Sequence, residues 1–351
     1  MTMAHSLDHR GRWNDVGLIA TLVESKSKYE TCTGRGSTGD HRQTDHAFAH
    51  RLDYASIVAT SERVAWSVDE VFRNRLFDAS CPLVPSSWLD TQALAFLDPD
   101  DQVVLNHCRA FSYVHLLGNF EEFLPVHLTG VAQQCWHDDR ARLRALLRFG
   151  EEEMKHQELF RRAERVLEAS CGHPFGRYFD ANKEKVTALT NAILSYSALP
   201  RFLIMLALEC GTQCHYVESI QARDGRGADP LYVDLLKAHW IEEAQHIKSD
   251  QLEIARLANT MSADARSAAF DDLLAIGALV DATFVGQAHE EIKTLGRVTG
   301  RTFAAGELAA LQDTLHRSLS RIFSAVGLTH PRFANVARDL STDGAAKLGI
   351  N

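Results

Sequence analysis

Apolar side chains recur every three to four residues along most of this chain, the period of an α-helix that buries one face. The pattern predicts helices over residues 51–77, 111–136, 138–171, 198–222, 230–258, 263–296 and 305–327. No run of alternating apolar and polar residues is long enough to build a sheet. We therefore expect an all-α fold.

Several helix ends carry their own signals. Asp138 is placed to cap a helix that runs to Cys171, and Gly172 stands where a left-handed residue commonly ends a helix. Asp229 followed by Pro230 predicts an N-cap and a first helical residue.

The same pattern divides the chain into three parts. Residues 1–48 are polar and without apolar periodicity, so we expect a mobile N-terminal extension there. His41, His46 and His50, in the polar segment 27–50, could bind stray metal, but we expect solvated side chains. Residues 49–341 are expected to form one helical domain, and residues 342–351 a C-terminal tail.

Composition and charge narrow the range of functions that the chain can have. The 351 residues are 45% hydrophobic and 24% charged, with a formal net charge of −9, which argues against binding to nucleic acid or to an anionic membrane. The longest apolar run, 202–208, is too short to span a bilayer, and no secretory signal is visible at the N-terminus. Seven cysteines without a CxxC motif favour free thiols in the reducing cytoplasm.

The predicted helices contain two Glu-x-x-His pairs: Glu153 with His156, and Glu243 with His246. Residues three apart on a helix share a face, so each pair can offer a carboxylate and an imidazole to one metal ion. A four-helix di-metal site needs one further glutamate from each of two other helices.

Helical hairpins indicate where those glutamates lie. In an antiparallel pair of helices, facing residues are equally far from the turn. Glu153 lies 16 residues after a turn near His137, and Glu121 lies 16 before it. Glu243 lies 17 residues after a turn near Arg226, and Glu209 lies 17 before it. The spacing thus predicts Glu121 and Glu209 as the partners.

Three neighbouring residues leave choices open. Glu122 is the alternative to Glu121, which we favour because it shares an apolar stripe with Leu117 and Leu124. His239, four residues before Glu243, falls on the same face and adds a third imidazole. Asp250, four after His246, is either an acceptor for the His246 ring or a solvated carboxylate.

The complete set has four glutamates and three histidines. We expect these ligands to hold two metal ions: Glu121, Glu153, His156, Glu209, His239, Glu243 and His246. Mixed carboxylate and imidazole ligation suits iron, or alternatively manganese, better than calcium or structural zinc. We predict no catalytic residue beyond the metal ligands.

With this ligand set, the sequence resembles the p-aminobenzoate N-oxygenase family of ferritin-like di-iron proteins. The motifs that carry the resemblance are Glu121, Glu153-x-x-His156, Glu209 and His239-x-x-x-Glu243-x-x-His246. The histidine four before the second Glu-x-x-His separates this family from ferritins and from other di-iron enzymes. The resemblance covers about residues 49–340 and implies a ferritin-like four-helix bundle with flanking helices.

The resemblance further implies an O2-dependent di-iron N-oxygenase that takes an amine, often an arylamine, towards hydroxylamine and nitro products. Such an enzyme needs an electron donor and a small-molecule amine, and a homodimer is a possible assembly. The alternatives are a di-iron oxidase that acts at carbon, and a ferritin-like metal-binding protein without oxygenase activity. A helical bundle without metal is the remaining alternative. In that case the symmetric spacing of the glutamates would be a coincidence.

Overall fold

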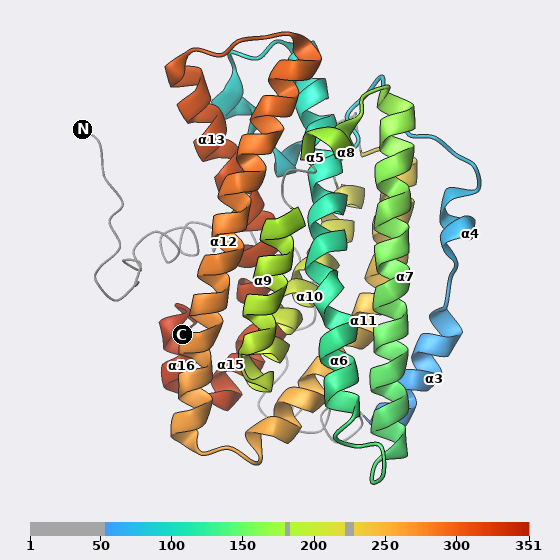
Figure 1. Cartoon of the computed structure of the whole chain (residues 1–351), viewed down its shortest axis with the longest axis vertical. Helices are drawn as coiled ribbons and strands as arrows, with labels where there is room; N and C mark the ends of the chain where they lie inside the picture. Colours follow the sequence, from blue (N-terminus) through green and yellow to red (C-terminus); the bar gives the residue numbers. More distant parts are fainter. Residues whose placement is uncertain (1–52, 180–182, 222–227, 351) are drawn as a thin grey trace.

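The computed structural model describes residues 53–179, 183–221 and 228–350, and every regular element in these ranges is helical, as the periodicity predicts (Figure 1). The elements are α3 (Tyr54–Val64), α4 (Val68–Phe72), η1 (Ser86–Trp88), η2 (Thr91–Leu94), α5 (Pro99–Phe120), η3 (Glu121–Phe123), α6 (Leu124–Ala132), α7 (Arg140–Cys171), α8 (Phe175–Phe179), α9 (Lys183–Ser195), α10 (Ala198–Gln221), α11 (Pro230–Ala258), α12 (Ala263–Thr299), α13 (Ala305–Ser320), η5 (Arg321–Ala325), α14 (Val326–Thr329), α15 (Pro331–Leu340) and α16 (Thr342–Lys347). The predicted extension, residues 1–48, and the glycine-containing loop 224–227 lie outside the described residues.

Two pairs of long helices form the centre of the molecule. The line formed by α5, η3 and α6 packs along α7, and α10 packs along α11. On the outer side of α7 lie α3 and α4, whereas α12 and α13 lie on the opposite side of the molecule (Figure 1). No helix among the described residues is long and apolar enough to cross a membrane.

The ends of α7 and α11 follow their sequence signals closely. Gly172 ends α7 with φ 69°, and Asp229 caps α11 by accepting from the backbone N–H groups of Leu231 and Tyr232. The predicted cap at Asp138 is wrong by one residue. Asp139 caps α7 instead, because its side chain accepts from the N–H of Arg142.

The helix predicted over 111–136 starts earlier and is interrupted at Glu121. Asp98 caps α5, which begins at Pro99. Pro125 lacks the N–H that would bond to the Glu121 carbonyl in a continuous helix, and its ring would collide with that carbonyl. The chain therefore passes through η3, and the Glu121 carbonyl accepts from Gln157 Nε2 at 3.1 Å instead.

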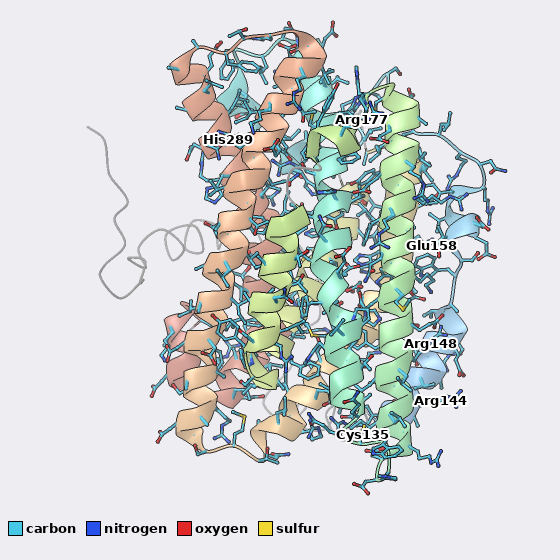
Figure 2. All side chains as sticks on the ribbon, viewed as in Figure 1. Cys135, Arg144, Arg148, Glu158, Arg177 and His289 are labelled. Carbon is cyan, nitrogen blue, oxygen red and sulfur yellow. The ribbon has the colours of Figure 1, made fainter. Side chains whose placement is uncertain are left out.

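The helix predicted over 51–77 is divided in two. Ala65 ends α3, and Ser67 begins α4 through a reciprocal capping pair with Glu70. Arg73 then ends α4 in the left-handed conformation, with φ 44°. On the outer face of α7, Arg144 and Arg148 reach the α3 residues Glu62 and Ser61 (Figure 2).

The C-terminal region contains more helix than predicted. The segment 305–327 becomes α13, the π-helical turn η5 and α14, after which α15 and α16 follow. The predicted tail includes α16, in which Ala345 is buried and Gly344 packs against the ring of Phe270.

Candidate metal centre

The two Glu-x-x-His pairs meet in the centre of the molecule. Glu153 and His156 of α7 face Glu243 and His246 of α11, and one ligand atom from each of these four residues lies within 4.8 Å of all the others. All four side chains are buried. The geometry that the sequence predicts for this pair of helices is therefore present.

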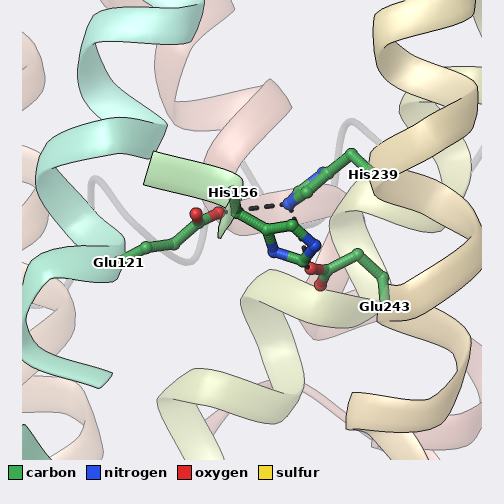
Figure 3. Close-up of side chains that lie close together, drawn as sticks. All are labelled: Glu121, His156, His239 and Glu243. Atoms are coloured by element: carbon green, nitrogen blue, oxygen red, sulfur yellow. Dashed lines mark hydrogen bonds and ion pairs between the residues drawn. The ribbon is translucent and has the colours of Figure 1, made fainter. Parts of the chain in front are cut away.

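A second group overlaps the first. Glu121, His156, His239 and Glu243 also place ligand atoms within 4.8 Å of one another (Figure 3). Oε1 of Glu243 lies 3.0 Å from Nε2 of His239 and 3.2 Å from Nδ1 of His156. His156 and Glu243 belong to both groups, so the two groups form one continuous cluster of buried Glu and His side chains.

The break at η3 decides between Glu121 and Glu122. Glu121 is buried, and its Oε1 lies 3.2 Å from Nε2 of His239. Glu122 is exposed and pairs with Arg161 at 2.9 Å. Only the first of these two glutamates faces the cluster.

Glu209 of α10 stands at the edge of the cluster. Its Oε2 lies 3.7 Å from Nδ1 of His246, and Thr212, one turn further along α10, lies within 3.4 Å of Glu243. Glu209 is not a member of either four-residue group, but it is buried beside them.

Two glutamates that the sequence reading passed over hold the histidine rings. Nε2 of His156 lies 3.0 Å from Oε2 of Glu242, and Nε2 of His246 lies 3.1 Å from Oε2 of Glu152. A carboxylate can only accept, so each ring carries its hydrogen on Nε2 and turns Nδ1 towards the cluster. The sequence does contain a signal for these two supporting residues, because a second glutamate directly precedes each Glu-x-x-His pair.

Each of these supporting glutamates has a cationic partner. Glu242 receives the ammonium of Lys155 at 2.5 Å. Glu152 pairs with Arg148 at 3.1 Å and accepts from the Ser61 hydroxyl. Their charges are therefore balanced locally and do not add to the charge of the cluster.

Asp250 does not hold the His246 ring, so that reading is wrong. Glu152 occupies the position at Nε2, and both carboxyl oxygens of Asp250 are buried without a hydrogen-bond partner among the described residues. The alternative of a solvated carboxylate is also wrong, because Asp250 is 0% exposed. Burial raises the pKa of its carboxyl well above the usual value.

The chemistry of the donor atoms fits a metal centre. Within the described part of the chain, these buried atoms have no hydrogen-bond donor or acceptor: Glu121 Oε2, Glu153 Oε1 and Oε2, His156 Nδ1, Glu209 Oε2, Glu243 Oε1 and His246 Nδ1. Nδ1 of a neutral His246 presents a lone pair to Glu153 Oε1 only 2.9 Å away. A cation or a proton must lie between such atoms. The buried Glu and His clusters are thus able to hold a metal ion.

Without metal, protons take that place. Burial lowers the pKa of His156, but hydrogen bonds to Glu153, Glu242 and Glu243 outweigh it and leave the pKa well above its usual value. The pKa of His246 is raised well above its usual value in the same way, because Glu153 and Glu243 outweigh burial. Burial and the charge of Glu153 raise the pKa of Glu121 well above its usual range.

Aromatic rings close the site against water. Phe149 stacks on His246 with ring centres 4.0 Å apart, and Phe160 meets His239 edge-on at 5.0 Å. Trp66 lies parallel to His156 at 6.0 Å. In such surroundings charges interact more strongly than in water.

A cavity of about 300 Å³ lies against α10 and α11. Its walls include Trp240, Ala244 and Ile247, each of which directly follows a predicted ligand in the sequence. Lys248 and Arg332 supply positive charge to it. These residues place the cavity on a face of α11 beside the face that carries His239, Glu243 and His246.

Comparison of this chain with protein-family models, with curated proteins and with solved structures yields no match. The resemblance to the N-oxygenase family consequently rests on the motif residues and stays a prediction.

Proposed function

We propose that this chain is a di-iron oxygenase that uses O2 to oxidise a small organic substrate, with N-oxygenation of an amine as its reaction. One observation carries the proposal: two overlapping Glu/His groups share His156 and Glu243 in a buried centre. The line α5–η3–α6, together with α7, α10 and α11, forms the ferritin-like four-helix bundle in this proposal.

Charge supports two divalent ions. Glu121, Glu153, Glu209 and Glu243 bring four carboxylates into a buried volume, and the three histidines are neutral as ligands. Two divalent cations would balance four negative charges, whereas one would leave an excess that a buried site tolerates poorly. Carboxylate oxygen and imidazole nitrogen together favour iron, with manganese as the alternative.

The residues have separate tasks in the proposed reaction. Two ferrous ions, when bound, would supply the electrons that reduce O2. Glu152 and Glu242 keep Nδ1 of His246 and His156 pointed at the centre. Phe149 and Phe160 exclude water from the faces of the rings.

Amine nitrogen as the reacting atom comes from the family resemblance, and His239 is the residue on which that resemblance depends. Its Nε2 lies between Glu121 and Glu243, at 3.2 and 3.0 Å, so it belongs to the position bordered by α5 and α11. A third imidazole adds a neutral donor at that position and makes the two positions unequal. An external electron donor, O2 and a small amine complete the proposed reactants.

The test is anaerobic reconstitution with ferrous iron, followed by O2 and a mass-spectrometric screen of aryl- and alkylamines. We expect about two iron ions per chain and a product that gains oxygen on nitrogen. Products oxygenated only at carbon would favour the carbon-acting oxidase, and ferric iron without organic product would favour the metal-binding alternative. One zinc and no iron in iron-supplemented protein would contradict the proposal.

Two neighbouring glutamates provide a matched control. Glu121→Ala removes a carboxylate from the cluster, whereas Glu122→Ala removes an exposed one that pairs with Arg161. Only the first variant should lose iron and O2-dependent product formation. Equal activity in both variants would contradict the assignment of the site.

A further inference from the structure

A second polar cluster is buried on α5 and α10, apart from the Glu/His groups. The hydroxyl of Tyr113 lies 2.7 Å from Nδ1 of His215, and the Trp88 ring packs on both, at 4.7 Å from Tyr113 and 5.5 Å from His215. All three side chains are at most 2% exposed. None of them has a part in the reaction proposed above.

The hydrogen bonds fix the direction of the proton. Nε2 of His215 lies 2.9 Å from the carbonyl of Ile322, in the π-helical turn η5. A carbonyl can only accept, so Nε2 carries the ring hydrogen and Nδ1 carries the lone pair. The Tyr113 hydroxyl therefore donates to Nδ1. Burial lowers the pKa of His215 to about 4, which leaves the ring neutral near pH 7 and able to receive a proton.

Tyr232 provides a comparison within the same core. It is fully buried, and its ring lies 6.4 Å from that of Tyr113. Its hydroxyl donates to the backbone carbonyl of Ala110 at 2.9 Å. An amide carbonyl is a hydrogen-bond acceptor but a very weak base, so it cannot take up the phenolic proton of Tyr232. The two tyrosines are thus equally buried, and their hydroxyls donate to acceptors of different basicity.

We propose that Tyr113 and His215 form a one-electron relay coupled to proton transfer, with Trp88 as the next ring towards the surface. Tyr113 gives one electron to a one-electron oxidant while its phenolic proton moves to Nδ1 of His215. The products are a neutral tyrosyl radical and an imidazolium. An electron from a reductant, passed through Trp88, then restores the phenol as the proton returns.

Position in the fold suits this relay. Tyr113 lies eight residues before Glu121 on α5, which corresponds to about 12 Å along the helix axis. Trp88 donates from Nε1 to Oε2 of Glu218 at 3.1 Å, and the Glu218 side chain is 14% exposed. The rings thus extend from a carboxylate with access to solvent towards the centre of the bundle. The inference rests on the proposed function only for the natural oxidant, which would be the oxidised metal centre.

The experiment uses metal-free, full-length protein, so that it is independent of iron and of oxygenase activity. The protein is flashed with tris(bipyridine)ruthenium(II) and persulfate and then frozen for electron paramagnetic resonance. We expect a tyrosyl radical signal that Tyr113→Phe removes and that Tyr232→Phe leaves unchanged. Signals from the other tyrosines cancel in the difference between wild type and Tyr113→Phe.

Three further measurements test the proton transfer and the electron path. His215→Gln should abolish the Tyr113 component, because an amide cannot take up the proton. Radical formation in the wild type should be slower in D2O than in H2O, which tests the same point without a variant. Trp88→Phe should lower the yield of the Tyr113 radical from the external oxidant.

The relay would be overturned by a wild-type signal in Tyr113→Phe, or by a signal that depends on Tyr232 instead. Equal rates in H2O and D2O would also overturn it. Failure of iron reconstitution would contradict the proposed function and leave these outcomes unaffected.

Discussion

Helix α11 carries two buried carboxylates that are stabilised in opposite ways. Glu253, near its end, is 0% exposed and has all its partners within the chain: Arg142 contacts its two oxygens at 2.6 and 2.8 Å, Tyr54 donates at 2.8 Å, and Arg256 lies at 3.1 Å. Glu243, in the middle of α11, is 2% exposed, and its Oε1 has no donor among the described residues.

The difference separates a structural charge from a candidate metal ligand. Arginine supplies a planar, permanent cation that matches a carboxylate, so Glu253 is stable in the folded chain as it stands. Around Glu243 the chain supplies further carboxylates and imidazoles, and the two four-residue groups contain no arginine or lysine. Burial alone does not distinguish the two residues, but the chemistry of their neighbours does: a permanent cation contacts Glu253, whereas groups that can bind either protons or a metal ion contact Glu243. The following predictions test this contrast.

The largest effect is expected from Glu243→Ala. The variant removes a carboxylate that both groups share, so O2-dependent chemistry should be abolished and fewer than two metal ions should bind. The metal-free protein should lose less than about 1 kcal/mol of unfolding free energy, because one of several like charges is removed. Metal analysis, O2 uptake and urea unfolding check this, and retained turnover would mean that the site is misassigned.

The pH dependence of metal binding should be steep. Since the pKa of His156 and of His246 is raised by the surrounding glutamates, both rings are protonated in the metal-free protein near neutral pH, and metal must displace these protons. Affinity should fall as pH falls, by about tenfold per unit for each proton released. Titration of Mn²⁺ or anaerobic Fe²⁺ at several pH values measures the slope, and a flat profile would contradict this account.

The unfolding free energy of the metal-free protein should change with pH in the direction opposite to that of metal affinity. Folding raises the pKa of His156, His246 and Glu121, so the folded chain binds their protons more tightly than the unfolded chain. That stabilisation is present at low pH and is lost as pH rises through the folded-state values. Above about pH 7, where the histidines of an unfolded chain have lost their protons, unfolding free energy should therefore decrease with pH without metal, and added metal should reverse the trend.

Arg142→Ala tests the other end of α11. Loss of the guanidinium leaves Glu253 buried with too little positive charge, which should cost about 3 kcal/mol of unfolding free energy. Metal stoichiometry should stay unchanged. Arg144→Ala is the control, because its pair with Glu62 is largely exposed and should contribute less than about 1 kcal/mol. Equal losses of unfolding free energy in the two variants would contradict the structural role assigned to the buried Arg142–Glu253 pair.

His239→Ala should leave two metal ions bound but weaken one of them by about a hundredfold, or about 3 kcal/mol. The reason is that His239 contacts Glu121 and Glu243 and belongs to only one of the two groups. The exposed His289 on α12 provides a control substitution (Figure 2). Two equal, unweakened sites and unchanged O2 kinetics would show that His239 is not a ligand.

The smallest of these effects is expected from Glu152→Ala, and likewise from Glu242→Ala. Without the acceptor at Nε2, the histidine ring is no longer held in one tautomer, and metal affinity should fall by roughly tenfold. Glu152→Gln keeps an acceptor oxygen and should recover most of that loss, whereas exposed Glu151→Ala should change nothing. Isothermal titration with Mn²⁺ resolves these differences.

The sequence predicted elements whose signals are local. The Asp229–Pro230 start of α11 and the Gly172 end of α7 are confirmed, because caps depend on neighbouring residues. Counting residues from the turns placed Glu121 and Glu209 beside the two pairs, because antiparallel helices keep a common register.

Other features depend on contacts between distant residues and could not be predicted in the same way. The break that turns Glu121 inwards is completed by Gln157, which replaces the donor that Pro125 lacks. Spacing along α11 pointed to Asp250 as the acceptor for His246. Glu152 lies on α7, and only the packing of α7 on α11 brings it to the ring. The division of residues 51–77 into two helices has a local signal instead, because Ser67 and Glu70 cap each other at the start of α4, and the apolar periodicity alone passed over it.

The crossed hydrogen bonds between α7 and α11 have a consequence for the symmetry of the centre. The same offset of 90 residues relates Glu152 to Glu242, Glu153 to Glu243 and His156 to His246, so the two helices present one pattern twice, face to face. His239 corresponds under this offset to Phe149, which stacks on His246, whereas His239 meets His156 at 4.5 Å. The pseudo-twofold relation fails at this pair. One half of the cluster has a nitrogen donor where the other half has a hydrocarbon wall, so the two halves of the cluster are chemically distinct.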